Sequence, residues 1–385
     1  LAGKRHAPMD KLVRCSLYIL SRVYATLVRW RISLYKNRIL KDHRLGCLVI
    51  SIGNLTVGGT GKTPVVEVFA RTLTKRNRKV AVLSRGYKSK SKPISEQFMD
   101  KLLMREDIVP PRVVSDGKDV LLNSHMSGDE PFMLAQNLDG VVVLVDKNRV
   151  KSGRYAIRHF NADTLILDDG FQYLHLKPRL NILLIDSTKP FTNHHMLPRG
   201  FLREPIQNLR RADIIFLTKS NGGDHLRHLK QFVKKHNPIA EIIECTHRPL
   251  YVQDIYSEKV FPLEFLNGKK VSSICGIAVP ESFETFLKGF GAELVYFERY
   301  ADHHRYSRAE IDSFITKSID AGAELILTTE KDAVRFPEFK EQALPMLFMR
   351  VEIDILSGQE SFQQCIDRIC FPALPNQTQT SIIID

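Results

Sequence analysis

The stretch that decides the fold is VISIGNLTVGGTGKTPVVEVFART, residues 49–72. An apolar, β-branched run is followed by a glycine-rich turn and by an apolar pattern of helical period, which predicts a buried strand, a tight loop and an amphipathic helix. Gly61-Lys62-Thr63 matches the end of a P-loop, where backbone N–H groups at a helix N-terminus bind phosphates. In that arrangement Lys62 reaches the β- and γ-phosphates, and the Thr63 hydroxyl binds Mg²⁺.

The loop departs from the strict P-loop pattern at one position. The pattern places a glycine five residues before Gly61, and this chain has Thr56 there. Gly58 and Gly59 compensate, because they still let the backbone approach a phosphate closely. A chance glycine turn is the alternative. The expected nucleotide-binding residues are Gly58, Gly59, Thr60, Gly61, Lys62 and Thr63.

Short apolar runs alternate with helical patterns along the first half of the chain. Continuous apolar runs are typical of strands buried on both faces of a parallel sheet. The predicted strands are 45–51, 79–84, 141–146, 164–169, 181–186 and 213–218, and the predicted helices are 63–76, 129–138, 203–210 and 224–236. The alternation predicts an α/β fold like that of P-loop NTPases, with a doubly wound, mostly parallel sheet.

The second half of the chain predicts a smaller α/β domain. Its apolar runs are 271–277, 292–297, 323–329 and 345–353, with helical patterns at 280–290, 307–320 and 358–370. Residues 88–111 are polar and basic and predict a surface insertion of no assigned role. The expected division is a basic arm (1–44), a P-loop domain (45–240), a ribbon or linker (241–270), the smaller domain (271–370) and a loose tail (371–385).

Composition excludes several classes of protein. The chain has 385 residues, 43% hydrophobic and 26% charged, which is typical of a globular protein and not of a disordered or polytopic membrane protein. Its six cysteines are scattered without a CxxC pair, which argues against a disulfide framework or a structural zinc site and favours a reducing compartment.

Most of the net charge of +13 lies in the first 44 residues, which have eleven basic and two acidic side chains. Residues 12–30 read LVRCSLYILSRVYATLVRW, in which the arginines gather on one side of a helix and apolar residues fill most of the rest. Three arginines make a membrane span or a signal peptide improbable, so we expect a helix in the interface of an anionic membrane. Packing on the body as an ordinary surface helix is the alternative.

Carboxylates at the ends of predicted strands are candidates for the metal. Asp168 and Asp169 are adjacent and could hold Mg²⁺ directly or through water beside Thr63. Asp146 and Asp186 are more simply helix caps or ion-pair partners. The guanine-specificity motif is incomplete, since residues 218–221 read Thr-Lys-Ser-Asn without the aspartate, and ATP is therefore the expected nucleotide.

Two other functional classes share part of this sequence pattern. Membrane-targeted ATPases that act as switches also combine a P-loop with an amphipathic helix, but their loop has an extra lysine where this chain has Val57. A nucleic-acid binder would not need the apolar face of the arm, because charge alone suffices on a phosphate backbone. No nucleic acid is expected as a partner.

A series of motifs resembles the tetraacyldisaccharide 4′-kinase family, the lipid A 4′-kinases of Gram-negative bacteria. The resemblance runs in order from the basic arm to about Arg335. Its motifs are GNLTVGGTGKTP (53–64), LSRGYK (83–88), GDEPFMLA (128–135), LDDGFQY (167–173), LPRGFLREP (197–205), RADIIFLTK (211–219), CGIAVPESF (275–283), ADHHRYS (301–307) and TTEKDAVR (328–335).

The resemblance implies transfer of the ATP γ-phosphate to the 4′-hydroxyl of a tetraacylated glucosamine disaccharide 1-phosphate, giving lipid IVA. It also implies a reaction at the cytoplasmic face of the inner membrane, where the basic helix meets anionic lipid. A monomer is expected. Asp129 and His303 match the family's Asp-His dyad, in which the imidazole takes the hydroxyl proton and the carboxylate orients it. Glu130 could assist with the metal. Because His303 and Lys62 fall in different predicted domains, catalysis is expected to need domain closure.

Simpler explanations exist for several of these residues. Asp129 and Glu130 precede Pro131, which also suits the start of a helix, and His303 could be a surface histidine. Arg85, Arg149 and Arg203 could contact phosphate or form ion pairs. The chain departs from the family pattern at Tyr173, where histidine is usual, and at Arg199 and Phe201, and these departures leave the acyl-chain or sugar preference open.

Overall fold

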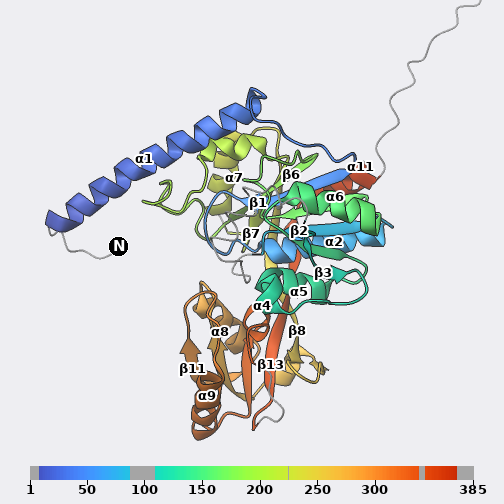
Figure 1. The fold of residues 1–385 in the computed structure, drawn as a ribbon. Helices are drawn as coiled ribbons and strands as arrows, with labels where there is room; N and C mark the ends of the chain where they lie inside the picture. The colour runs from blue at the N-terminus through green and yellow to red at the C-terminus, as the bar shows by residue number, and fades with distance from the viewer. Residues whose placement is uncertain (1–7, 87–108, 224, 338–342, 371–385) are drawn as a thin grey trace, which may run out of the picture.

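The computed structural model describes residues 8–86, 109–223, 225–337 and 343–370, and it shows two lobes that share one sheet (Figure 1). The strands are β1 (Leu48–Asn54), β2 (Val80–Ser84), β3 (Arg112–Asp116), β4 (Val142–Val145), β5 (Thr164–Asp168), β6 (Leu180–Asp186), β7 (Ile214–Thr218), β8 (Glu241–Asp254), β9 (Val260–Phe261), β10 (Lys270–Cys275), β11 (Glu293–Arg299), β12 (Leu325–Thr329) and β13 (Met346–Ser357). The helices are α1 (Pro8–Lys36), α2 (Lys62–Lys75), α4 (Ser124–Ser127), α5 (Asp129–Asn137), α6 (Arg149–Phe160), α7 (His225–His236), α8 (Pro280–Gly289), α9 (Arg308–Asp320), α10 (Glu330–Ala333) and α11 (Gln359–Cys370), with 3-10 turns η2 (Ile206–Arg211) and η3 (Leu263–Leu266).

The large lobe has the doubly wound arrangement that the sequence predicts. Its strand order is β3-β4-β2-β5-β1-β6-β7-β8, and every pair is parallel except β3 with β4. The α2, α5 and α11 helices bury their apolar faces on one side of this sheet, and α6, α7 and η2 cover the other. The β1 strand lies at the centre, so the loop that follows it opens at the carboxyl edge of the sheet, where ligands bind in such folds.

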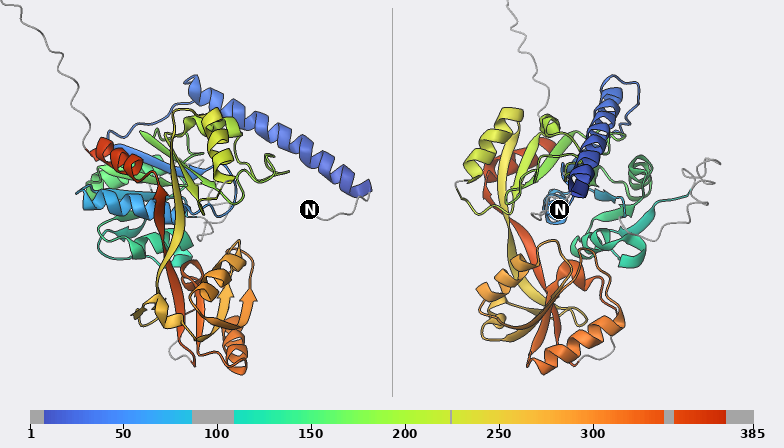
Figure 2. Two further views of the ribbon diagram at one scale, coloured as in Figure 1. Left: turned by 180° about the vertical axis from the view of Figure 1, so that it is seen from behind. Right: turned by 90° about the vertical axis from the view of Figure 1, so that its left-hand side faces the viewer.

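A long two-stranded ribbon joins the lobes, as the views in Figure 2 show. The first residues of β8 pair in parallel with β7, and the rest of β8 pairs antiparallel with β13. The β13 strand then continues the sheet through β12, β10 and β11, with α8 and α9 packed on opposite faces. The predicted segment 241–270 therefore contains the longest strand of the described chain, and the two lobes share a single sheet.

Several elements differ from the prediction. The sequence pattern predicts neither β3 nor α6, and the helix expected at 203–210 is the 3-10 turn η2. Although α11 was assigned to the smaller domain, its Phe362 packs on Phe69 of α2 with ring centroids 5.2 Å apart, so it completes the core of the large lobe. An amphipathic pattern shows which face of a helix is buried, but not against which partner. The predicted tail (371–385) and most of the predicted insertion (88–108) lie outside the described residues.

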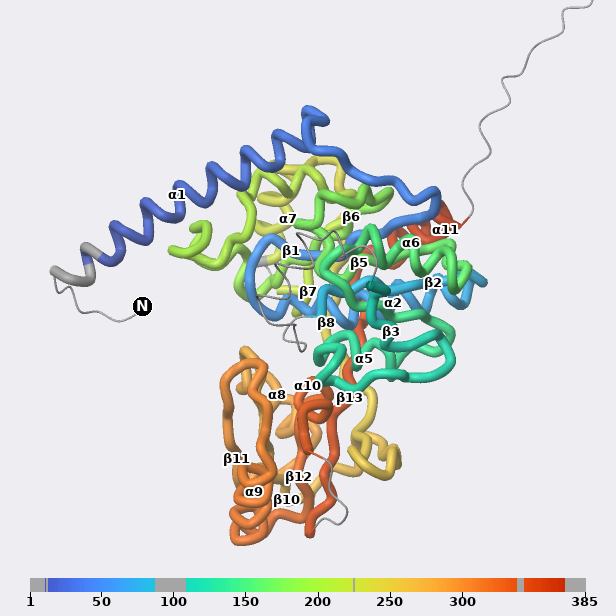
Figure 3. The backbone as a smooth tube through the Cα atoms, viewed as in Figure 1, coloured from blue at the N-terminus to red at the C-terminus, as the bar shows by residue number. Residues whose placement is uncertain are grey.

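The first helix, α1, contacts the body along one narrow face, and its amino-terminal part projects away from it (Figure 3). Ser21 and Ala25 are buried, and Ser21 Oγ donates a hydrogen bond to the carbonyl of Met196 at 2.9 Å. Other apolar side chains of this helix remain exposed to solvent: Val13, Tyr18, Ile19, Leu20, Val23, Leu27 and Trp30. In the described part of the chain, no helix is long and apolar enough to cross a membrane.

A buried ionic cluster holds the ribbon against the P-loop helix. Arg350 of β13 donates to both oxygens of Glu330 at 2.6 Å and also pairs with Glu67 of α2. The amide of Asn137 on α5 donates to Glu330 at 2.5 Å and to Glu67 at 3.1 Å. Burial raises the pKa of Glu330, and the nearby Glu67 adds to this against the attraction of Arg350. One guanidinium therefore holds two carboxylates from different lobes.

We predict that Arg350→Met destabilises the protein by about 3–5 kcal/mol, because it leaves two buried carboxylates without their cation. Urea unfolding followed by circular dichroism measures the loss. The matched control is Arg248→Met on the same ribbon, whose partner Glu352 is reached across an exposed surface, and whose cost we expect to stay below about 1 kcal/mol. Equal effects of the two variants would contradict the importance of the buried cluster.

Candidate active site

The P-loop is positioned by a glycine and by two residues of a neighbouring strand end. Gly61 precedes α2 with φ 75°, and a Cβ there would lie 2.9 Å from Nε2 of His247. Thr218 at the end of β7 donates from Oγ1 to the carbonyl of Thr60 at 2.9 Å. The Lys219 ammonium donates to the carbonyl of Gly59 at 3.0 Å and to Asp186 at 2.6 Å. Hydrogen bonds from the end of β7 therefore hold the P-loop in position.

Lys62, the predicted phosphate-binding lysine, points toward the carboxyl ends of β1 and β5. Its Nζ lies 3.4 Å from Oδ1 of Asn54 and 3.6 Å from Oδ1 of Asp169. Arg203 donates to both oxygens of Asp169 at 2.8 Å and also reaches the carbonyl and side chain of Asn54. Burial alone would raise the pKa of Asp169, but Arg203 and Lys62 lower it below the usual range.

The neighbouring carboxylate, Asp168, has the opposite environment. It is 3% exposed, and its Oδ2 accepts a hydrogen bond from Ser84 at 3.1 Å. Its Oδ1 is buried and accepts no hydrogen bond from the described residues. Burial and the charges of Glu130 and Asp169 raise its pKa. A buried carboxylate oxygen without a partner is the arrangement that a bound cation would relieve.

Asp129 and His303 come from different lobes and meet at the junction. Asp129 begins α5 in the large lobe, and its Oδ2 lies 3.6 Å from Nδ1 of His303. Arg335 donates to the same oxygen at 2.8 Å, and Arg305 donates to the other oxygen at 3.0 Å. Burial would raise the pKa of Asp129, but the contacts with His303, Arg335 and Arg305 outweigh it and lower the pKa to about 2. The carboxylate is therefore charged at neutral pH.

The loop carrying His303 is constrained. The residue has φ 63°, a left-handed conformation that side chains other than glycine rarely adopt, and its backbone N–H donates to the carbonyl of Gly276. The neighbouring His304 instead contacts Glu310 on α9 at 3.1 Å. The backbone therefore directs the first histidine to the junction and the second to the surface of the small lobe.

The structure brings the predicted residues together in two groups. The first contains the P-loop residues with Asp168 and Asp169. The second contains Asp129 and His303 with Glu130, whose Oε1 lies 3.8 Å from Nζ of Lys331. The two groups are neighbours because α5, which begins at Asp129, packs beside α2, which begins at Lys62. Among the described residues, no group of three or more His, Cys, Asp or Glu side chains is placed to hold a metal ion alone.

Sequence reasoning missed the residues that orient this site. It left Arg203 open between phosphate and ion-pair roles, and the structure shows the ion pair. It gave Arg335 and Arg305 no role, although both occur in motifs that it singled out. Arg149 lies over the ring of Tyr173, with its guanidinium carbon 4.5 Å from the ring centroid. Asn54 carried no signal beyond its place before the glycine-rich loop.

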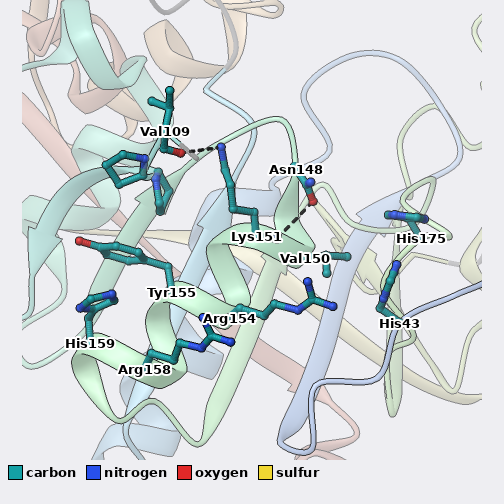
Figure 4. Close-up of a pocket in the computed structure, with 12 residues that line it drawn as sticks. His43, Val109, Asn148, Val150, Lys151, Arg154, Tyr155, Arg158, His159 and His175 are labelled. Carbon is teal, nitrogen blue, oxygen red and sulfur yellow. Dashed lines mark hydrogen bonds between the residues drawn. The ribbon is translucent and has the colours of Figure 1, made fainter. Parts of the chain in front are cut away.

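A separate basic pocket lies on the outer side of α6 (Figure 4). Lys151, Arg154 and Arg158 line it from successive turns of the helix, and His43 and His175 close one side. Lys151 is paired with Asp146 at 2.6 Å and donates to the carbonyl of Val109. None of the predicted catalytic or nucleotide-binding residues lines this pocket.

Comparisons with known proteins agree on one family. The sequence model of the tetraacyldisaccharide-1-P 4′-kinase family, LpxK, matches residues 13–370. Tetraacyldisaccharide 4′-kinases of Halothermothrix orenii and Syntrophus aciditrophicus are 36% and 37% identical to this chain, over 93% and 91% of both chains. The crystal structure of LpxK from Aquifex aeolicus in complex with ATP superposes with a TM-score of 0.70 at 26% identity, covering 93% of this chain and 100% of that one.

We predict that Gly61→Ala lowers the stability of the ligand-free protein by about 1–3 kcal/mol, because the residue needs a positive φ and its Cβ would meet His247. Thermal unfolding measures this effect. Gly289→Ala is the matched control, since a Cβ there meets no atom within 4 Å. An unchanged melting temperature for Gly61→Ala would show that the loop can adopt another conformation at no cost.

Proposed function

We infer the function of this chain from its family: it belongs to the tetraacyldisaccharide-1-P 4′-kinase family, and it is a kinase that phosphorylates a sugar hydroxyl in lipid A biosynthesis. The observation that carries the assignment of its residues is the meeting of Asp129 and His303 at the start of α5, the helix that packs beside the P-loop helix α2. A phosphate-binding loop needs only to hold a nucleotide, whereas a carboxylate–imidazole pair next to it can also activate an acceptor.

We propose that ATP binds to residues 58–63 with its β- and γ-phosphates at Lys62. The Aquifex aeolicus relative was solved in complex with ATP, which supports this choice of nucleotide. Because Lys62 lies between Asn54 and Asp169, its ammonium group is held at the loop before the nucleotide arrives. Such preorganisation lowers the cost of fixing a long side chain on binding.

We propose that Mg²⁺ is held by the Thr63 hydroxyl and Asp168, with Glu130 near enough to assist. The unpartnered oxygen of Asp168 supports this, because a bound cation would stabilise the ionised form of this buried carboxylate. Asp169 is a poorer ligand, since both of its oxygens are bonded to Arg203, and its role is to hold Lys62 and Arg203 in place. When bound, Mg²⁺ would neutralise charge on the phosphates.

The acceptor hydroxyl is activated by the pair at the junction. His303 takes the proton of the sugar 4′-hydroxyl, and the charged Asp129 stabilises the imidazolium that forms. Arg335 and Arg305 keep Asp129 ionised and fixed in position. Since the base lies in the small lobe and Lys62 in the large one, closure of the lobes brings the hydroxyl to the γ-phosphate and excludes water.

The substrate is a disaccharide-phosphate lipid, and we propose that it is the tetraacylated glucosamine disaccharide 1-phosphate, taken from the cytoplasmic face of the inner membrane. The exposed apolar side chains of α1 support contact with a bilayer, because Ile19, Leu20, Val23, Leu27 and Trp30 lie away from the body. The basic residues of the same helix would then meet anionic headgroups. An acylated acceptor could thus be phosphorylated without leaving the membrane.

We predict that transfer of label from γ-labelled ATP to the lipid in detergent micelles distinguishes the two parts of the site. Lys62→Met should lose transfer and weaken ATP binding, because it removes the phosphate-binding cation. His303→Ala should lower kcat by about 10²–10⁴-fold and leave ATP affinity nearly unchanged, because it removes only the base. Hydrolysis of ATP without labelled lipid would instead favour a switch ATPase, and an unchanged rate for His303→Ala would exclude it as the base.

We predict that the double variant Leu20→Ser, Leu27→Ser binds vesicles containing phosphatidylglycerol at least tenfold more weakly than the wild type, because two side chains of the apolar face become polar. Sedimentation with vesicles measures the bound fraction. Ile239→Ser, an equally apolar change at an 85% exposed loop site in the large lobe, is the control and should bind normally. Undiminished binding of the double variant would refute the membrane role of α1.

A further inference from the structure

The ammonium group of Lys331 lies at the imidazole nitrogen that the proposed base needs. Lys331 belongs to α10, and its Nζ lies 3.1 Å from Nε2 of His303. The same Nζ lies 3.5 Å from Oδ1 of Asp302 and 3.8 Å from Oε1 of Glu130. The Lys331 side chain is 24% exposed, so a ligand that enters the junction can displace it.

This contact decides which nitrogen of the ring carries a proton. An ammonium group only donates hydrogen bonds, so Nε2 must accept, and the neutral ring then carries its proton on Nδ1. Nδ1 faces Oδ2 of Asp129, which can accept from it. This is the form of histidine that a general base requires, with its free lone pair on the nitrogen that faces the substrate.

A second cation competes for the same ring. Nη2 of Arg335 lies 3.2 Å from Nδ1 of His303 and, like Lys331, can only donate. A neutral imidazole has one acceptor nitrogen, so it cannot accept from both. Arg335 already donates to Asp129 at 2.8 Å and to Asp332 at 3.0 Å, and its bonding does not depend on the ring. Without Lys331, the cation that opposes a proton on Nε2 is lost, and the ring can adopt the tautomer in which Nδ1 accepts from Arg335.

We propose that Lys331 is a positioning residue that keeps Nε2 of His303 free of a proton and yields its place there to the sugar hydroxyl. This inference rests on the proposed role of His303 as the base. Once displaced, the ammonium stays between Asp302 and Glu130, so its charge remains paired. The hydroxyl proton then passes to Nε2, its oxygen bonds to the γ-phosphorus, and the bond from that phosphorus to the bridging oxygen breaks, with its electron pair leaving on ADP.

The charges that face the ring come from both lobes. Lys331, Arg335 and Asp302 lie in the small lobe, and Asp129 faces the ring from α5 of the large lobe. A cation at Nε2 opposes protonation of the ring before substrate arrives. Its removal should therefore change how the rate depends on pH, a change that a purely structural contact between the lobes would not produce.

The test compares Lys331→Met and Lys331→Arg with the wild type across pH 5.5–9, measuring kcat and KM for each substrate. For Lys331→Met we expect kcat/KM for the lipid to fall about tenfold near pH 5.5 and to recover above pH 8, because the acid limb of the profile moves up by about one pH unit. The KM for ATP should not change. Lys331→Arg should restore most of the rate near neutral pH, since a guanidinium is also a cationic donor.

The outcomes separate this inference from the assignment of the base. Lys317→Met is the control, because it removes a cation of the small lobe that pairs with Glu298 and not with His303, and it should leave the profile unchanged. A wild-type profile for Lys331→Met, or a loss that is equal at every pH and not rescued by arginine, would overturn the role of Lys331. A wild-type rate for His303→Ala would instead remove the base on which the inference rests.

Discussion

The buried carboxylate of Asp129 is the constraint on which the catalytic junction depends. An isolated carboxylate at this depth would be neutralised by proton uptake, since burial penalises its charge. Arg335 and Arg305 reverse that tendency, and both belong to the opposite lobe. The ion pairs that keep Asp129 charged are thus the same contacts that hold the lobes together at His303. The same ion pairs therefore stabilise the contact between the lobes and keep the Asp129 carboxylate ionised.

Burial and neighbouring charges also shift the pKa values of two adjacent carboxylates in opposite directions. Asp168 ends the β5 strand and Asp169 follows it, and the two side chains have different partners. Asp169 is bonded to Arg203 and lies beside Lys62, and its pKa is lowered. Asp168 has a hydroxyl partner on one side only, and its pKa is raised. Asp169 is therefore a fixed counter-ion of Lys62 and Arg203, whereas Asp168 has a buried oxygen without a hydrogen-bond partner, which is what makes it the better candidate for a metal ligand.

The sequence predicts the α/β fold class and the P-loop because both depend on local patterns, whereas the pairing of Asp129 with His303 is predicted only from the resemblance to the kinase family. Neighbouring residues in the sequence are enough to predict the buried strands, the loop around Gly61 and the start of α5 at Asp-Glu-Pro. What it missed depends on long-range contacts. The helical pattern of α11 could not show that Phe362 would pack on Phe69, nearly 300 residues earlier. Likewise, nothing near Arg335 in the sequence shows that its guanidinium reaches Asp129, because only the β8–β13 ribbon brings them together.

A chain of contacts connects α1 to the P-loop. The hydroxyl of Tyr24 on α1 donates to the carbonyl of Arg203 at 3.1 Å, and Ser21 donates to Met196 in the same segment. The Arg203 side chain then holds Asp169, which lies against Lys62. The backbone of Arg203 accepts the hydrogen bond from the helix, while its guanidinium is bonded to Asp169 and Asn54. The segment that packs on α1 therefore also carries the side chain that fixes the carboxylate beside Lys62, so a change in the position of α1 would be transmitted to the P-loop through Arg203.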